Sequence, residues 1–416
     1  MPPNARSFDP TLALSGSPVS ANAGRPPGTR QFLGMISALT LASVFLLPMG
    51  ADALLGLLML VALFRWPQAG VHARGVLRDP LFGCAALLLG YLGASVSWSA
   101  GATWVDQAQV WLRITYVVAF LLSLSAALWL PGFLRQLCQL VTLAAAVSAL
   151  ICLVWFALGG GELGRLSGLF RYDNPGRAGR LFCAALPFIA MYWALEPGRR
   201  RWFAAAAAAL VLAAMVATDT RSAWLGACLG LSALLFGYIQ QSGARHVLHL
   251  GCAFALLAAA VLFAIQELPA IDWLFPRGDS FRLGIWSAYL RDVLAGPWWF
   301  GWGQATEHWV SVGDARFRGA HNIYLSVLGQ VGVPGLILFL TLLGWSAVRL
   351  LRRLGAPAAR LSWSLLVIGA SVFMFSGDRI VDKVNLVWFV VWVPLAVALA
   401  LRADGAAKLE LEEQPR

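Results

Sequence analysis

Long apolar runs separated by short polar segments dominate the chain between residues 31 and 402. Most runs approach the ~20 residues that a helix needs to cross a bilayer, and they exceed a transmembrane β-strand. Since lipid admits only helices and closed barrels, the pattern predicts an all-α helical bundle of about 12 spans. The expected spans are residues 31–50, 51–66, 80–98, 107–130, 134–158, 178–196, 201–217, 221–240, 246–267, 333–352, 361–377 and 384–402.

Both ends of the chain lie outside this single transmembrane domain, which we place at residues 31–402. Residues 1–30 are polar and rich in Pro, Gly and Ser, which predicts a disordered cytoplasmic tail. A cleaved signal is not expected, because the first apolar run starts late and another follows at once. Residues 403–416 form a second cytoplasmic tail.

Composition supports a membrane protein. Of the 416 residues, 59% are hydrophobic and 12% are charged, whereas a soluble domain carries about 25% charged residues. A soluble enzyme, a disordered chain and a disulfide scaffold are therefore excluded. All six cysteines fall within apolar runs, so no disulfide outside the membrane is expected.

The net charge of +11 comes mainly from arginines between the apolar runs, which is a topology signal and not a nucleic-acid signature. With both termini in the cytoplasm, the cytoplasmic segments hold 18 Lys and Arg residues and the external segments hold 12. The first two external loops have none, so the external arginines concentrate later in the chain. This concentration favours an anion site there, and a neutral solvated face is the alternative.

The connection between the ninth and tenth expected spans, residues 268–319, is 52 residues long, well beyond the usual loop length. We expect residues 268–332 to form an external insertion with short helices that carries the functional site. The connection contains six of the 19 tryptophans. They fit either an aromatic belt at the membrane interface or a surface that stacks on sugars.

Within this insertion, the stretch DSFRLGIWSAYLRDVLAG predicts a helix that ends at Gly296-Pro297. Its apolar residues recur every fourth position, as on a surface-lying helix, at Phe281, Ile285, Tyr289 and Val293. Arg282 has Trp286 and Tyr289 on roughly the same side. An arginine flanked by aromatic rings suits a sugar diphosphate, and a lipid-headgroup anchor is the alternative.

The next helical pattern begins at His321. An unbroken helix from His321 to Arg352 would reach about 48 Å, well over a hydrocarbon core of about 30 Å. The GQVGVPG stretch offers a break, so we expect a short interfacial helix at residues 321–331 and a separate span after it. His321 would lie in the first turn, where the helix dipole favours a neutral imidazole that accepts a proton. A structural histidine at the membrane rim is the alternative.

Three sequence blocks share the expected external face: GRLSGLFRYDNPGRAG, TDTRSAWLG, and the stretch from FRLGIW through GPWWFGWG to HNIYLSVLGQVGVPGL. Together they resemble the bacterial O-antigen ligases, within the O-antigen ligase/polymerase superfamily. One departure is Thr220, where Ser is commoner. The blocks identify the superfamily better than they separate ligase from polymerase. The matching residues are Arg165, Gly168, Phe170, Asn174, Arg221, Arg282, Trp286, Gly301, Gly303, His321, Asn322 and Leu325.

The resemblance implies a fold like that of the polyprenyl-dependent (GT-C type) glycosyltransferases. It implies transfer of an O-antigen glycan from undecaprenyl diphosphate to a sugar hydroxyl of lipid A–core, in lipopolysaccharide biosynthesis. The site would face the periplasm from the bacterial inner membrane. The reaction would invert the anomeric carbon, without a metal or another cofactor. The expected partners are the two substrate lipids and the membrane lipids, and no nucleic acid.

The chemistry of this reaction suggests roles for individual residues. His321 is the expected general base for the acceptor hydroxyl. Arg221 and Arg282 are the expected catalytic arginines, because a guanidinium fork stabilises diphosphate oxygens at any relevant pH. Further donor-binding candidates are Arg165, Arg171 and Arg113, and the sugar-contact candidates are Trp286, Tyr289, Asn322 and Tyr324.

Some features indicate no specific chemistry. No Asp-x-Asp pair, His-x-x-x-His pair or cluster of external carboxylates predicts a metal site. Arg113 lies inside the fourth expected span, so its side chain could simply reach back to the interface. Residues 378–383 predict an ordinary mixed-charge turn after the eleventh span.

Two groups of alternatives remain open. An O-antigen polymerase or a protein O-oligosaccharyltransferase would use the same donor with another acceptor. A twelve-span transporter would belong to a different class, but transporters place ionisable groups near the bilayer midplane and often contain repeats. Here the spans are nearly free of charge, and no repeat between the halves is evident.

Overall fold

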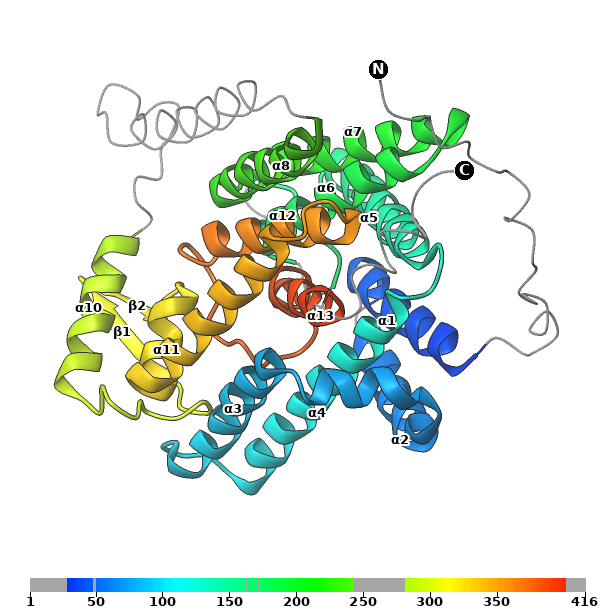
Figure 1. Cartoon of the computed structure of the whole chain (residues 1–416). Coiled ribbons are helices and arrows are strands. Elements are labelled where there is room, and N and C mark those ends of the chain that lie inside the picture. The colour runs from blue at the N-terminus through cyan, green and yellow to red at the C-terminus, as the bar shows by residue number, and fades with distance from the viewer. Residues whose placement is uncertain (1–27, 48–49, 162–163, 171–172, 243–280, 402–416) are drawn as a thin grey trace, which may run out of the picture.

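The computed structural model describes residues 28–47, 50–161, 164–170, 173–242 and 281–401 (Figure 1). This part is a helical bundle, so the predicted all-α membrane fold is confirmed. Eight of its helices are long and apolar enough to cross a membrane. They are α1 (Thr29–Leu46), α3 (Pro80–Ser95), α4 (Trp104–Ala127), α5 (Phe133–Ala157), α6 (Pro175–Leu195), α7 (Arg201–Thr218), α8 (Arg221–Ser242) and α11 (Ile323–Leu351).

Shorter apolar segments account for three further expected spans. They lie in α2 (Gly50–Leu77), in α12 (Pro357–Val372), and in the π-helical turn η6 (Trp388–Trp392) continued by α13 (Val393–Ala400). The expected boundary at residue 66 is wrong, because α2 runs on to Leu77. The ninth expected span, residues 246–267, lies outside the described residues.

The segment formed by η6 and α13 lies in the middle of the bundle (Figure 1). All residues from Trp388 to Ala400 are buried, as expected for a helix that is apolar on every side. The indole of Trp388 packs edge-on against Phe120 of α4, with 5.1 Å between ring centroids. The last expected span is therefore the core around which the other helices pack.

Contacts between loops test the predicted alternation of the spans. At one end of the bundle, the Arg135 guanidinium donates two hydrogen bonds to Glu196, which follows α6. Arg349 near the end of α11 pairs in the same two-pronged way with Asp79, which caps α3. All four residues belong to segments expected on the cytoplasmic face. Each pair thus joins two segments that are expected from the sequence to lie on the same side of the membrane.

The Glu196 carboxylate is buried beside two arginines. Burial by itself would raise the pKa of Glu196, but hydrogen bonds from Arg135 and Arg200 outweigh it and hold this pKa below its usual range. Because the folded-state pKa is lowered, the stabilisation is complete above the ordinary glutamate pKa of about 4.3. It is lost as the pH falls through the folded-state pKa.

Replacing Glu196 with Gln is expected to lower the stability of the bundle by about 2 kcal/mol at neutral pH, since Arg135 loses its charged partner. The difference from the wild type should disappear in acid. Thermal unfolding in detergent at both pH values measures this. Glu307→Gln is the control, because the pair of Glu307 with Arg318 is half-exposed and contributes little. Equal melting temperatures for the two variants at neutral pH would contradict the assignment.

The external insertion contains a small subdomain with its own apolar core. Helix α10 (Arg282–Ala295) packs against a hairpin of two antiparallel strands, β1 (Trp309–Val312) and β2 (Ala315–Arg318). Short helices are expected here from the sequence, and the structure has a β-hairpin in addition. The sequence feature that predicts this hairpin is the alternation of apolar and polar residues in WVSVGDARFR around Gly313. Gly313 has a φ of +59°, which suits the first position of a two-residue hairpin turn.

The predicted break in the tenth span is confirmed. Val331 and Gly332 have non-helical backbone angles within α11, and Pro334 follows them. The free backbone groups at this kink pair with the GPWWFGWG segment: Trp302 N–H donates to Gly329, Gly303 N–H to Gln330, and Val333 N–H to the Trp298 carbonyl. A helix break at membrane depth is tolerated where protein satisfies its backbone in this way.

Gly332 is the most constrained residue of the kink. Its φ is +65°, and a Cβ would collide with the Trp299 carbonyl. Gly332→Ala is therefore expected to destabilise the protein by more than about 1 kcal/mol. Gly344→Ala is the matched control, because Gly344 lies in the regular part of α11 with no atom near its Cβ position. Thermal unfolding of both variants checks this, and an unchanged melting temperature for Gly332→Ala would contradict it.

Candidate functional site

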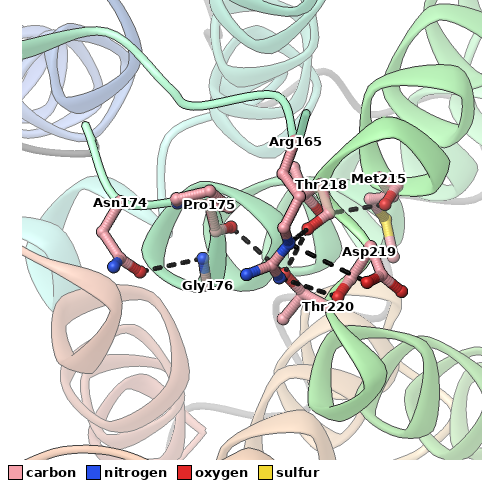
Figure 2. Close-up of polar contacts among 8 residues, drawn as sticks. All are labelled: Arg165, Asn174, Pro175, Gly176, Met215, Thr218, Asp219 and Thr220. Carbon is pink, nitrogen blue, oxygen red and sulfur yellow. Dashed lines mark hydrogen bonds and ion pairs between the residues drawn. The ribbon is translucent and has the colours of Figure 1, made fainter. Parts of the chain in front are cut away.

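The start of α6 is held against the turn between α7 and α8 (Figure 2). Asn174 caps α6, because its Oδ1 accepts hydrogen bonds from the Gly176 and Arg177 N–H groups. The Thr220 hydroxyl donates to the Pro175 carbonyl at 3.1 Å. Gly179 approaches Thr220 so closely that a Cβ would not fit. The first turns of α6 therefore lie directly beside the start of α8.

Arg165 also binds the turn between α7 and α8, through hydrogen bonds to its carbonyl groups (Figure 2). Its Nε donates to the Thr218 carbonyl at 3.0 Å, and its Nη2 donates to the Asp219 carbonyl at 2.7 Å. Leu166 N–H also donates to the Ala217 carbonyl. Arg165 thus satisfies the terminal carbonyls of α7, so it has a structural partner that sequence reasoning did not foresee.

Arg165→Ala is expected to lower the stability by about 1 to 3 kcal/mol, because two charge-assisted hydrogen bonds are lost. The donor affinity of the folded protein should stay near that of the wild type. Thermal unfolding and donor-lipid titration separate the two effects. Weaker donor binding at an unchanged melting temperature would instead assign Arg165 to the diphosphate.

Four arginines, on α6, α8 and α10, lie near this turn. Arg180 of α6 interacts electrostatically with the positive charges of Arg282 and Arg177 and with the negative charge of Asp378. Arg282 is the first residue of α10, and its Cζ lies 5.5 Å from the centroid of the Phe375 ring. Arg180 is thus within charge range of Arg177 and Arg282, and Arg221 begins α8 directly after Thr220, whose hydroxyl bonds to the start of α6. We call these four arginines the arginine cluster.

The arginine cluster brings together both expected catalytic arginines. It also contains Arg177 and Arg180, which sequence reasoning did not select. The missed signal is their position: both lie in the first two turns of α6, directly after the capping residue Asn174. Several like charges held close together favour binding of an anion.

His321 lies beside the same region but not in a helix. It precedes Asn322, whose Oδ1 accepts hydrogen bonds from the Tyr324 and Leu325 N–H groups and so caps α11. The expectation that His321 lies in the first turn is therefore wrong by two residues. Its φ is +48°, a left-handed conformation, and its side chain is half-buried. Ile323 N–H donates to the Phe373 carbonyl.

The segment after α12 connects His321 to the arginine cluster. Phe373 accepts the hydrogen bond from Ile323, Phe375 lies under Arg282, and Asp378 acts on Arg180. The Gln330 side chain donates to the Asp378 carbonyl, and the Gln304 side chain donates to Val381. Residues 378–383, expected from the sequence to be an ordinary mixed-charge turn, therefore make contacts with several other elements.

Arg113 forms an ion pair with Asp382 of that segment, at 3.1 Å. Its guanidinium thus reaches the segment that follows α12. The pair links α4 to the residues after α12. Arg171, another expected donor-binding residue, lies outside the described residues.

The sugar-contact candidates differ in how accessible they are. Trp286 is half-buried, with its ring 6.1 Å from that of Phe375. Tyr289 is buried. Burial raises its pKa, and the negative charges of Asp378 and Asp292 raise it further. Tyr289 also packs edge-on against Trp302. It is a core residue of the subdomain, with no free ring face for a sugar.

The remaining two sugar-contact candidates are both engaged by the backbone. The Asn322 amide oxygen caps α11, and the Tyr324 hydroxyl donates to the Ala370 carbonyl at 3.1 Å. In the described part of the chain, no group of three or more His, Cys, Asp or Glu side chains could hold a metal ion.

Comparison with known proteins identifies this polytopic helical protein as a glycosyltransferase-type membrane enzyme. A family model described as O-antigen ligase matches residues 206–340, which contain Arg221, Arg282 and His321. An O-antigen ligase of Pseudomonas aeruginosa is 25% identical over 329 residues, or 78% of each chain. The chain is therefore similar to O-antigen ligases, which agrees with the resemblance inferred from its motifs.

Proposed function

We propose that this protein transfers an O-antigen glycan from undecaprenyl diphosphate to a sugar hydroxyl of lipid A–core. The transfer takes place on the periplasmic face of the bacterial inner membrane, with both termini in the cytoplasm. The observation that carries the proposal is that one segment, after α12, bonds to the start of α11 next to His321 and also contacts Arg282 of the arginine cluster. The cluster suits an anionic donor, and the histidine suits proton transfer.

The proposed reaction is a single displacement. The acceptor hydroxyl attacks the anomeric carbon, and His321 takes the hydroxyl proton. The bond between the anomeric carbon and the diphosphate oxygen breaks with inversion. The diphosphate leaves as an anion that Arg221 and Arg282 stabilise through fixed positive charge. Arg177 and Arg180 add to this field from the start of α6.

A metal ion is not needed in this scheme, because the arginines neutralise the diphosphate directly. Transfer should therefore persist in EDTA. Arg113, paired with Asp382, contributes by holding α4 against the segment that passes through the site. Among the aromatic candidates, Trp286 remains the best placed for a sugar, since it is half-buried beside Arg282 and Phe375.

The deciding experiment uses purified protein with an undecaprenyl-diphosphate glycan in the presence of EDTA. Lipid A–core and excess free donor compete as acceptors. Product on lipid A–core supports the ligase proposal. Elongated donor would instead establish a polymerase. Transfer to neither lipid would overturn the proposal in favour of a protein acceptor or transport.

A further inference from the structure

Helix α10 has two apolar faces, whose centres are about 120° apart around the helix axis. One packs into the subdomain core through Ile285, Tyr289 and Val293. The other consists of Leu283, Leu290 and Leu294, which lie within about 40° of one another at 100° per residue. All three leucines are at least 38% exposed. Figure 1 shows α10 at the outer edge of the molecule, with β1, β2 and α11 on its inner side.

The exposed apolar surface continues beyond the end of α10. Three consecutive aromatic residues, Trp298, Trp299 and Phe300, form the turn that follows, and each is about half-exposed. We call these residues and the three leucines the outer apolar surface. Arg291, also exposed, lies at its flank. A surface of this kind on a soluble face would carry a large cost in water, so it requires a partner.

Both ends of α10 are fixed at the level where the membrane helices end. At its start, Arg282 lies over Phe375, just beyond the end of α12. After its end, the aromatic turn pairs with the kink in α11, where Val333 N–H donates to Trp298. From that kink to Leu351, α11 extends about 28 Å, close to a hydrocarbon thickness of about 30 Å. The kink and α10 therefore lie near one membrane interface.

We infer that the side chains of the outer apolar surface insert into the outer leaflet, so that α10 lies in the membrane interface. The partner is phospholipid: the leucines contact acyl chains, the aromatic turn lies at the headgroup boundary, and Arg291 faces lipid phosphate. Ile337 and Leu340 of α11, which follow the kink that the aromatic turn contacts, are also about half-exposed. Arg282, on the same helix, is thereby held at the depth of a lipid headgroup. The inference requires only a membrane bundle and not the proposed reaction.

The test places an environment-sensitive fluorophore at single cysteines in the full-length protein, reconstituted in phosphatidylcholine nanodiscs. The labelled variants are Leu290→Cys and Leu294→Cys. Asp314→Cys is the control, because Asp314 is exposed at the tip of the β-hairpin. Of the six native cysteines, Cys84, Cys138, Cys152 and Cys183 are buried. Mock labelling of the protein without the new cysteine measures the background from all native thiols.

Dibrominated phosphatidylcholine should quench the probes at positions 290 and 294 and leave the probe at 314 unchanged. A water-soluble quencher should give the opposite order. Equal exposure of all three probes to the water-soluble quencher would overturn the inference, because the leucines would then face water. Protection of positions 290 and 294 from both quenchers would also overturn it, because another protein segment would then cover them.

A second measurement is independent of labelling. Leu290→Glu should weaken partition of the subdomain into the bilayer, and quenching at Leu294→Cys by brominated lipid should fall in that background. Ser287→Ala is the matched change on the same side of α10 that removes no apolar contact. Unchanged quenching in the Leu290→Glu background would overturn the inference that the outer apolar surface contacts lipid.

Discussion

Replacing His321 with Asn is expected to lower the rate of glycan transfer by a factor on the order of 10² to 10⁴, the usual contribution of a general base. Donor binding should remain close to that of the wild type, because His321 is not part of the arginine cluster. Asn is preferred to Ala because His321 has a φ of +48°, and Asn tolerates the left-handed conformation. Single-turnover transfer together with donor titration measures the two effects.

His308→Asn is the matched control for this variant. His308 lies in the same external insertion, but its Nε2 is 2.9 Å from Asp292 and its ring stacks on Trp302 at 4.0 Å. Its loss should lower the melting temperature and leave saturated transfer near the wild-type rate. If His321→Asn retains near-normal turnover, the base lies elsewhere. If both histidine variants lose transfer equally, folding and not proton transfer explains the loss.

Arg221→Ala and Arg282→Ala are each expected to lower the rate by about 10² to 10³, the range for loss of one group that stabilises developing charge. Unlike the His321 variant, they should also weaken donor binding, because the diphosphate is charged before and during transfer. Lys at either position should restore only part of the activity, since an ammonium lacks the planar fork of a guanidinium. Steady-state transfer and donor titration distinguish these outcomes.

Arg316→Ala removes the same charge from the external insertion without touching the cluster. Arg316 lies on β2, exposed, with its guanidinium over the Trp309 ring at 5.7 Å. The Arg316→Ala variant should retain normal donor affinity. This result would show that the cluster variants lose affinity because of their position and not because the net charge is lower. Near-normal binding and rate in both cluster variants would move the diphosphate site away from α8 and α10.

The arginine pair and the histidine lie on elements that are far apart in sequence. Arg221 begins α8, Arg282 begins α10, and His321 precedes the cap of α11. Each is at or beside the start of a helix, where a residue is fixed by a cap or a packed turn. This explains how a membrane protein can hold several charged groups together with short connecting segments on each side.

Several features of the protein were determined by the sequence alone. The helical class follows from apolar runs long enough to cross a bilayer, and the break in α11 follows from Gly332 and Pro334. The helix α10 follows from apolar residues at every fourth position, and three of these, Ile285, Tyr289 and Val293, form the subdomain core. These predictions succeeded because run length, local backbone preference and helix periodicity depend on residues close together in the chain.

Only the tertiary structure decided which polar groups meet. Arg165 is occupied by the carbonyls at the end of α7, and Tyr289 is buried, although both had been candidates for substrate contact. Arg180 joined the arginine cluster, and Asp378 lies beside it. These partners are separated by tens to hundreds of residues, so their pairing depends on how whole helices pack and not on any local pattern. The sequence determined which segments form helices, and the packing of those helices determined which side chains face one another.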